Sequence, residues 1–380
     1  MRLFMSVDLV GSTAFKAKHS DRRDGDEPYP VWLNRTRSFY RQFPQIIDNL
    51  FAEYSGILDG REAFKHRSPK VWKTVGDEII FCIRIVCLEH LACCIRSFVK
   101  ALSAYGDLIN SQEPELDVKG CAWVASFPAP NATVTSASRF SIQQTESQVG
   151  DQLEEKDEQE ADINPGEYDF LGKQIDTGFR ISKFAQAHEL ALSIDLAWLL
   201  TLLRQRDLVD CQFTYRGKEA LKGVIGGAPY PIITVQTERS TDKRELDSLE
   251  RTVAGVSFAE PISLRNYLHS FMVQNKVEIP IVVLHHDKID EAKLPKCYDA
   301  LKAAWGLGER EDAEREKAKQ EANDYDDDVA RELSTPETPG TPAPALDPAP
   351  TPASAEPSNI GEINLTIDRM IDEYWSSGKW

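Results

Sequence analysis

The sequence predicts an α/β (α+β) protein with a ferredoxin-like core and a mixed or antiparallel sheet. Strand and helix patterns follow one another in the order strand, helix, strand, strand, helix, strand, which is the order of that core. The two middle strands are separated only by Gly76-Asp77, a dipeptide typical of tight turns. Hydrophobic residues make up 41% of the 380 residues, which is enough to bury a core.

Each element is expected from its local pattern. Runs rich in branched apolar and aromatic residues predict strands, and longer segments with helical apolar spacing predict helices. The first long helix is expected to begin after Pro30. In chain order the expected elements are a strand at 3–8, a helix at 31–54, strands at 71–75 and 78–85, a helix at 86–105, a strand at 118–126, a helix at 172–187, and strands at 190–194, 211–215 and 230–235.

Shifts in composition divide the chain into domains. Residues 1–237 form the main domain, and residues 238–308 form a small C-terminal α/β domain. Within the main domain, residues 146–169 carry ten acidic residues and one basic residue without apolar periodicity, which predicts a solvated insertion loop. The small domain is expected to hold helices at 242–253, 263–273 and 294–305 and a buried strand at 279–284.

The C-terminal tail has a different composition. Residues 309–358 form a charged and Pro-rich linker, in which residues 336–357 hold eight of the chain's 21 prolines. Residues 359–380 then show apolar positions at helical spacing and predict a short amphipathic helix. That helix is expected either to dock on the protein's own body or to bind a partner, and the sequence favours neither alternative.

Charge and cysteine content narrow the class of protein. The formal net charge of −17, from 44 Lys and Arg against 61 Asp and Glu, excludes a general nucleic-acid binder because phosphate repulsion would not be offset. A nucleotide site needs only a few cations and a metal, so it is not excluded.

Seven cysteines, an odd number without a Cys-x-x-Cys pair, predict reduced thiols in a cytoplasmic protein. Neither a signal peptide nor a run of ~18 apolar residues is expected, so the sequence predicts no membrane contact.

Two carboxylates stand where the predicted topology brings them together. Asp8 ends the first strand, and Asp77 lies in the turn of the central hairpin. In a ferredoxin-like sheet these two points are neighbours, and two carboxylates there make an oxygen-rich site suited to Mg²⁺ or Mn²⁺. The small residues Gly11, Ser12 and Thr13 leave backbone N–H groups able to approach a phosphate chain.

Four segments resemble motifs of the class III nucleotidyl cyclases. The two metal-binding motifs of that family are similar to SVDLVGST and WKTVGDEIIF. Its base- and ribose-contacting stretch is similar to YDFLGKQIDTGFRI, and its late phosphate-binding lysine motif to ALKGV. The four matches occur in the family's order and cover roughly residues 2–236. None of the seven histidines falls in these motifs, which agrees with a reaction that needs no histidine base.

The resemblance implies a role for each matching residue. The two metal aspartates would bind two divalent ions, Mn²⁺ or Mg²⁺, in each active site. The implied roles are Asp8 and Asp77 for metal, Gly11, Ser12 and Thr13 for phosphate, Lys73 and Asp169 for the base, Asp176 for the ribose or transition state, Arg180 for the pentavalent phosphorus, Lys222 for the terminal phosphates, and Lys119 in place of a family arginine. Asp176 departs from the family's asparagine and, as a carboxylate, cannot donate a hydrogen bond. It is expected to pair with Arg180, four residues on, or to contact the sugar.

The implied reaction is attack of the ribose 3′-hydroxyl on the α-phosphorus with departure of pyrophosphate. Metal ions together with Arg180 and Lys222 would stabilise the developing charge. In the family the active site lies at a dimer interface, where one protomer gives the metal aspartates and the other gives the base, ribose and phosphate contacts. This chain carries both sets, so the resemblance implies a symmetric head-to-tail homodimer with two sites.

The nucleotide stays open on hydrogen-bond logic alone. A lysine–aspartate pair matches adenine at N1 and N6, cytosine at N3 and N4, and uracil at O4 and N3–H. The chain's size, acidic insertion and appended domain also resemble the pyrimidine cyclases of Pycsar antiphage systems. That resemblance implies UTP as substrate and cyclic UMP as a messenger for a separate effector, with cyclic CMP second. Cyclic AMP formation and a catalytically inactive module for dimerisation or sensing are the competing interpretations.

Overall fold

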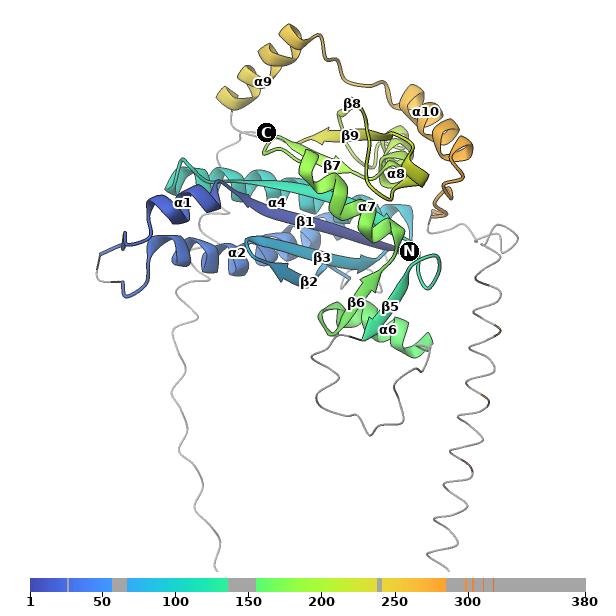
Figure 1. The fold of residues 1–380 in the computed structure, drawn as a ribbon, viewed down its shortest axis with the longest axis horizontal. Coiled ribbons are helices and arrows are strands. Elements are labelled where there is room, and N and C mark those ends of the chain that lie inside the picture. The colour runs from blue at the N-terminus through green and yellow to red at the C-terminus, as the bar shows by residue number, and fades with distance from the viewer. Residues whose placement is uncertain are drawn as a thin grey trace, which may run out of the picture. The chain divides into compact units, whose positions relative to one another are not determined.

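The computed structural model describes residues 1–25, 27–56, 67–135, 155–237 and 241–284, with single positions at 298, 303, 310 and 317 (Figure 1). The chain divides into two units, Met1–Arg315 and Glu316–Trp380, and the helices and strands of the described residues lie in the first. The predicted helix at 294–305, the linker at 309–358 and the helix at 359–380 lie outside the described ranges. Among the described helices, none combines the length and the apolar content needed to cross a membrane.

A seven-stranded sheet carries the fold. Its strand order is β2-β3-β1-β4-β7-β9-β8, and all neighbouring strands are antiparallel except β4 and β7. The first four positions have the order of a ferredoxin-like core, so the predicted fold class is confirmed. The strands are β1 (Arg2–Val10), β2 (Lys70–Val75), β3 (Glu78–Arg84), β4 (Asp117–Ala125), β7 (Glu189–Leu192), β8 (Phe213–Glu219) and β9 (Tyr230–Gln236).

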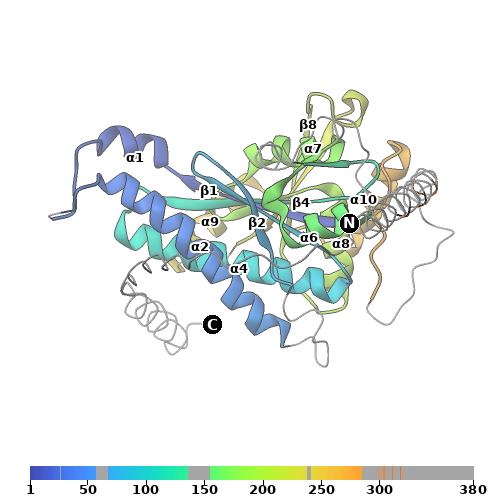
Figure 2. The same ribbon diagram turned by 90° about the horizontal axis from the view of Figure 1, so that it is seen from below.

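Two long helices pack side by side on one face of this sheet (Figure 2). They are α2 (Val31–Ser55) and α4 (Leu88–Gln112), and they confirm the two predicted helices, with α4 extending further than expected. Buried aromatic rings join them, since the Phe43 ring of α2 lies 6.1 Å from Phe98 and 5.7 Å from Tyr105 of α4, centroid to centroid. This aromatic contact forms the core beneath the sheet.

The opposite face of β4 is covered by α7 (Lys173–Ile181), which is shorter than the helix predicted at 172–187. A Cβ atom added at Gly178 of α7 would lie 2.2 Å from Cδ2 of Trp123 on β4. The Trp123 ring is fully buried and therefore has no space into which to move. Gly178 thus allows α7 to approach the sheet closely and fixes the position of the side chains that α7 carries.

Substituting Gly178 by alanine is expected to lower the stability of the protein by about 1–3 kcal/mol, the usual cost of overpacking a core. The sign of the change in unfolding free energy is informative, because a glycine-to-alanine substitution at an open helix position would instead stabilise the protein by about 1 kcal/mol. Thermal and urea unfolding would measure the change. Lys173→Ala, at an exposed position on the same helix, is the matched control and should leave the stability almost unchanged. Equal or higher stability of Gly178→Ala would contradict the proposed close approach.

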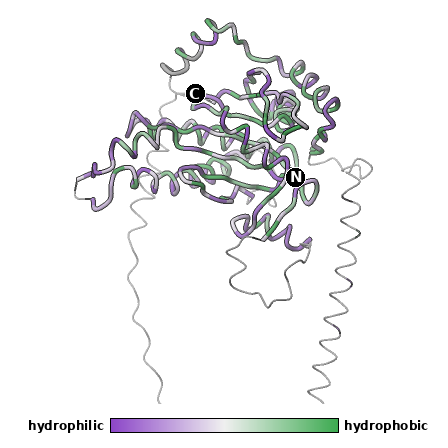
Figure 3. Tube along the Cα trace, in the orientation of Figure 1, coloured by the Kyte–Doolittle hydropathy of each residue, from purple (hydrophilic) through white to green (hydrophobic). Residues whose placement is uncertain are grey.

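Part of the acidic insertion is folded. Its described part forms α6 (Glu155–Ile163), a 3₁₀ turn at Pro165–Glu167 and β6 (Tyr168–Leu171), which pairs with β5 (Ala132–Thr135). Although α6 is largely hydrophilic (Figure 3), Arg2 is buried beneath it, with its guanidinium 2.7 Å from Glu158 Oε2 and 2.8 Å from Asp162 Oδ1. The prediction of a solvated loop is therefore wrong for residues 155–169, because acidic side chains there neutralise a buried cation.

The segment after the sheet holds two helices. They are α9 (Thr241–Ala254) and α10 (Pro261–Gln274), and both were predicted. Helix α10 packs on α8 (Ile194–Gln205), which was not predicted. The prediction of a strand at 279–284 is wrong, because these residues join no sheet in the described part of the chain; the Val283 carbonyl instead accepts a hydrogen bond from a backbone N–H of α4 at 3.0 Å.

A buried ion cluster ties α9 to the edge of the sheet. Glu189 of β7 is only 1% exposed and accepts hydrogen bonds from three side chains. Arg251 of α9 lies 2.7 Å from its Oε1 atom, and Arg216 Nε and Thr234 Oγ1 lie 3.0 and 2.9 Å from its Oε2 atom. Arg251 also donates to Thr214 Oγ1 at 2.9 Å. The carboxylate of Glu189 is therefore the hub that joins three strands and a helix.

Candidate active site

A small cavity of about 150 Å³ contains both predicted metal aspartates. Its walls come from four strands, β1, β2, β3 and β4, from the turn between β2 and β3, and from the segment after α7. The lining residues are Ser6, Asp8, Val75, Asp77, Glu78, Lys119, Gly120, Cys121, Ser182, Lys183 and Ala185. The structure thus supports the expectation that the end of the first strand and the central turn are neighbours.

Asp8 lies in a row of three charged side chains across the sheet. It is directly opposite Glu78 of β3 on one side and Lys119 of β4 on the other. Residues paired in this way project to the same face of a sheet. Lys119 Nζ lies 3.2 Å from Asp8 Oδ2. Burial raises the pKa of the Glu78 carboxyl, and the negative charges of Asp8 and Asp77 raise it further, against the lowering effects of a hydrogen bond with Ser6 and of the Lys119 cation.

Asp77 is held by the turn between β2 and β3. Its carbonyl accepts a hydrogen bond from the backbone N–H of Leu9 at 3.2 Å, which fixes the turn against the end of β1. Its carboxylate accepts a hydrogen bond from the Ser12 hydroxyl and lies 3.7 Å from Lys16 Nζ. The Tyr40 hydroxyl donates to the adjoining Gly76 carbonyl. The turn is therefore braced from three directions, and its carboxylate faces the cavity.

The donor set of the cavity fits a divalent cation. Asp8 and Asp77 offer carboxylate oxygens, which are the ligands that Mg²⁺ and Mn²⁺ prefer, and neither side chain is fully buried. Within the described ranges, no group of three Asp, Glu, His or Cys side chains is arranged to bind an ion. Magnesium is commonly bound through one or two carboxylates together with substrate phosphates, so a pair of aspartates is a sufficient protein contribution.

The Gly11-Ser12-Thr13 segment opens a short helix, α1 (Ser12–Lys18), beside the cavity. Gly11 has a φ of +82°, and a Cβ atom there would lie 2.3 Å from the Glu115 carbonyl oxygen, so only glycine fits. The backbone therefore turns sharply at the end of β1 and brings Ser12 to Asp77. This arrangement keeps the first helical turn close to the two aspartates.

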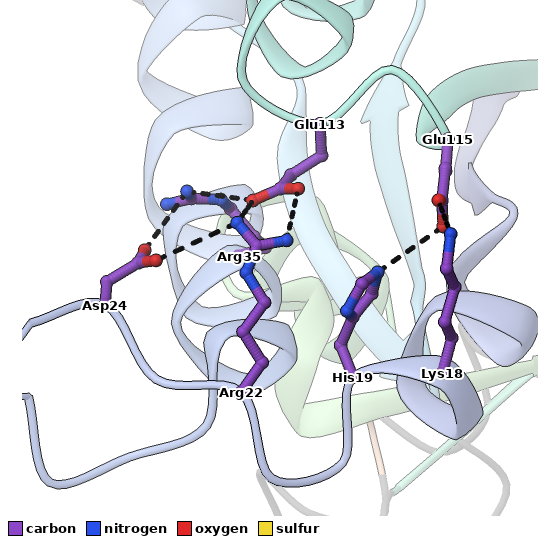
Figure 4. A network of polar contacts seen from close by, with 7 residues as sticks. All are labelled: Lys18, His19, Arg22, Asp24, Arg35, Glu113 and Glu115. Atoms are coloured by element: carbon purple, nitrogen blue, oxygen red, sulfur yellow. Dashed lines mark hydrogen bonds and ion pairs between the residues drawn. The ribbon is translucent and has the colours of Figure 1, made fainter.

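A network of ion pairs fixes the far end of α1 (Figure 4). Lys18 and His19 both face the Glu115 carboxylate, and His19 Nε2 lies 3.6 Å from it. The nearly buried Glu113 lies 3.1 Å from both Arg22 and Arg35. Because Glu113 and Glu115 lie in the connection between α4 and β4, this network holds α1 against the strand that carries Lys119.

The predicted base-reading pair is formed in the structure. Lys73 Nζ of β2 lies 2.8 Å from Asp169 Oδ1 of β6. The neighbouring Trp72 donates from its indole N–H to the Tyr168 carbonyl at 3.0 Å, which aligns the two strands. Both members of the pair are partly exposed. They can therefore present one cationic donor and one anionic acceptor to a ligand.

The predicted phosphate-contacting residues gather at α7. Arg180 Nη1 donates to the Asp176 carbonyl at 3.1 Å and lies 3.8 Å from the Asp176 carboxylate, which confirms their expected pairing. Arg180 Nη2 is 3.9 Å from where a Cβ atom of Gly223 would lie, so the exposed Lys222 is on a loop beside Arg180. Within the described residues Lys222 forms no ion pair.

The candidate residues thus form two sets in one chain. The first surrounds the cavity with Asp8, Asp77 and Lys119, and the second comprises the Lys73–Asp169 pair and the Arg180 cluster with Asp176 and Lys222. No hydrogen bond or ion pair joins the two sets among the described residues.

Sequence reasoning missed two charged residues next to the first set, Glu78 and Lys16. Glu78 follows Asp77 directly in the sequence, but only the strand register shows that it lies opposite Asp8. Lys16 lies on α1, a short helix that the sequence pattern did not predict.

Comparison with known proteins gives structural similarities only. No protein-family model matches the chain, and no curated protein matches it. The adenylyl cyclase CyaB from P. aeruginosa is similar with 11% identity and a TM-score of 0.40, over 63% of this chain and 95% of that one. The guanylate cyclase domain of RhGC from Catenaria anguillulae, in complex with GTP, is similar with 9% identity and a TM-score of 0.34, over 63% and 97%. The guanylyl cyclase Cya2 is similar with 12% identity and a TM-score of 0.30, over 62% and 90%.

Proposed function

We propose that the protein is a nucleotidyl cyclase that converts a nucleoside triphosphate to its 3′,5′-cyclic monophosphate and pyrophosphate. The observation that supports this function most directly is that Asp8 and Asp77 line one cavity together with the cation Lys119. The formed pair of Lys73 and Asp169 adds a second support. Four sequence motifs that resemble those of class III cyclases supply these residues in the family's order.

The reaction joins the ribose 3′-oxygen to the α-phosphorus and breaks the bond from that phosphorus to the β-phosphate oxygen, and the hydroxyl proton passes to solvent. Asp8 and Asp77 would bind Mg²⁺ or Mn²⁺, which when present lowers the pKa of the attacking hydroxyl and neutralises triphosphate charge. Arg180 stabilises charge on the phosphoryl oxygens, and Lys222 stabilises the departing pyrophosphate. Lys119, released from Asp8, is placed to contact a phosphate.

The active enzyme is proposed to be a head-to-tail homodimer. Each chain carries both sets of residues, yet no hydrogen bond or ion pair joins them among its described residues. A two-fold axis would bring the first set of one protomer to the second set of its partner, and vice versa, which creates two identical sites. A monomer would then hold two half-sites and have little activity.

UTP is the proposed substrate, and cyclic UMP the proposed product. Lys73 can donate to uracil O4 while Asp169 accepts from N3–H. The same pair suits cytosine and adenine, and the preference for UTP rests on the likeness of the chain to pyrimidine cyclases of antiphage systems. In that biology the enzyme is cytoplasmic, and its product is a messenger for a separate effector. CTP and ATP are the alternative substrates.

Incubating the purified protein with Mn²⁺ and each of ATP, GTP, CTP and UTP, followed by chromatography, tests the proposal. We expect cyclic UMP from UTP, with little product from the other three and none when EDTA removes the metal. Cyclic CMP or cyclic AMP as the main product would support the cyclase proposal but would show that CTP or ATP, not UTP, is the substrate. No cyclic product from any nucleotide by a metal-loaded dimer would contradict the cyclase proposal and favour a sensing or dimerisation module.

A further inference from the structure

We propose that Phe179 is the surface on which the nucleobase stacks, a substrate-binding role that rests on the proposed function. Phe179 lies on α7, directly before Arg180, and its side chain is 37% exposed. Large aromatic side chains in a folded domain usually bury their rings, so a rigidly held and accessible ring beside charged groups is informative.

The Phe179 ring is held in place by two tryptophans. Its centroid lies 5.6 Å from that of Trp123 at an interplanar angle of 52°, and 6.3 Å from that of Trp72 at 44°. Both tryptophans are buried. The contact with Trp123 depends on the close approach of α7 that Gly178 permits. The ring is therefore preorganised, and stacking on it requires little loss of side-chain entropy.

The exposed ring lies beside the pair that reads the base edge. Lys73 Nζ is 6.0 Å from the Phe179 centroid and 2.8 Å from Asp169 Oδ1. A base atom that accepts a hydrogen bond from Lys73 lies about 2.9 Å from Nζ. A ring stacked on Phe179 lies roughly 3.5–4 Å from it. The two distances are compatible, so one planar base can contact Lys73 at its edge and Phe179 at its face.

This geometry divides the recognition of the nucleotide between two elements. Stacking accepts any base, because every base has an aromatic face. The Lys73–Asp169 pair discriminates between bases, because it requires a defined acceptor next to a defined donor. Phe179 is therefore expected to raise the affinity for all nucleotides by a similar factor. The Lys73–Asp169 pair is expected to determine which nucleotide binds most tightly.

Isothermal titration calorimetry of the full chain with α,β-methylene-UTP, a substrate analogue that cannot be cyclised, tests this assignment. Phe179→Leu keeps apolar packing on the tryptophans but removes the aromatic face, and we expect affinity to fall by about 5- to 150-fold. Phe179→Trp should bind within about two-fold of the wild type, because it retains an aromatic face. Inorganic tripolyphosphate, which has no base, should bind the wild type and Phe179→Leu equally.

Tyr29→Leu is the matched control. Tyr29 is also exposed and contacts a cation, since Arg37 lies 4.2 Å from its ring centroid, but it is remote in sequence from the Lys73–Asp169 pair. It should bind the analogue as the wild type does. The inference is overturned if Phe179→Leu binds the analogue unchanged, or if it weakens tripolyphosphate binding to the same extent, which would indicate a general structural effect.

The inference and the proposed function can fail separately. If the wild-type protein forms cyclic product while Phe179→Leu binds the analogue normally, the cyclase proposal stands and the stacking role of Phe179 is refuted. If binding depends on Phe179 but the wild-type protein forms no product, the stacking role stands and the cyclase proposal is refuted. A wild-type protein that binds neither the analogue nor any other nucleotide overturns both.

Discussion

Replacing Asp77 by asparagine is expected to abolish cyclic nucleotide formation, with a loss of about 10³-fold or more. The carboxylate faces the cavity from a turn that three contacts brace, so asparagine can occupy the same place with its shape preserved. What is lost is the negative charge that binds a divalent cation, and such a cation contributes several kcal/mol to stabilising the transition state. Pyrophosphate release and chromatography of the product measure the effect. Asp8→Asn should behave in the same way.

The control for this experiment is Asp48→Asn, an exposed aspartate on α2 that should retain full activity. Titration of Mn²⁺ by electron paramagnetic resonance provides a second readout, and both site variants should bind the ion more weakly than the wild type. Circular dichroism checks that they remain folded. Full activity of Asp77→Asn would contradict the assignment of this cavity as a site for a divalent cation.

Replacing Glu189 by alanine is expected to destabilise the protein by about 3–5 kcal/mol, the cost of breaking a buried ion pair by removing one partner. The carboxylate is buried and faces two guanidinium groups, those of Arg216 and Arg251. Without it, the Arg251 cation would lose the buried carboxylate that faces it, while its hydrogen bond to the Thr214 hydroxyl would remain. Urea unfolding followed by fluorescence measures the loss.

Glu219→Ala removes a carboxylate from an exposed position on β8 and serves as the matched variant. Its stability should remain within about 0.5 kcal/mol of the wild type. Hydrogen exchange provides an independent test, since protection of α9 should fall in Glu189→Ala because Arg251 anchors that helix. An unchanged unfolding midpoint for Glu189→Ala would show that the cluster contributes no net stability.

The core elements were predictable because their signals are local. The first strand is an apolar run, Gly76-Asp77 is a turn dipeptide, and the helix after Pro30 has an extended periodic pattern. From that order the ferredoxin-like topology follows, and with it the meeting of Asp8 and Asp77. These two aspartates could therefore be placed in one cavity without any structural information.

The wrong predictions concern features that depend on contacts between distant parts of the chain rather than on local sequence. The acidic composition of α6 indicated solvent, because nothing near it in sequence reveals that Arg2 is buried against it. Residues 279–284 have the composition of a strand, but they pair with no described strand. Glu78 entered the site through strand register, a property that becomes visible only once the pairing with β1 is known.

Three carboxylates of the site are already paired with lysines of the same chain. Asp8 faces Lys119, Asp77 faces Lys16, and Asp169 faces Lys73. A triphosphate with its counter-cation would therefore enter by exchanging partners, with phosphates taking the lysines and the cation taking the carboxylates. Little net field extends from such paired groups, so long-range electrostatic steering contributes little to nucleotide capture. These paired groups are thus expected to add little to the ionic-strength dependence of nucleotide association, which is set mainly by repulsion from the chain's net charge of −17.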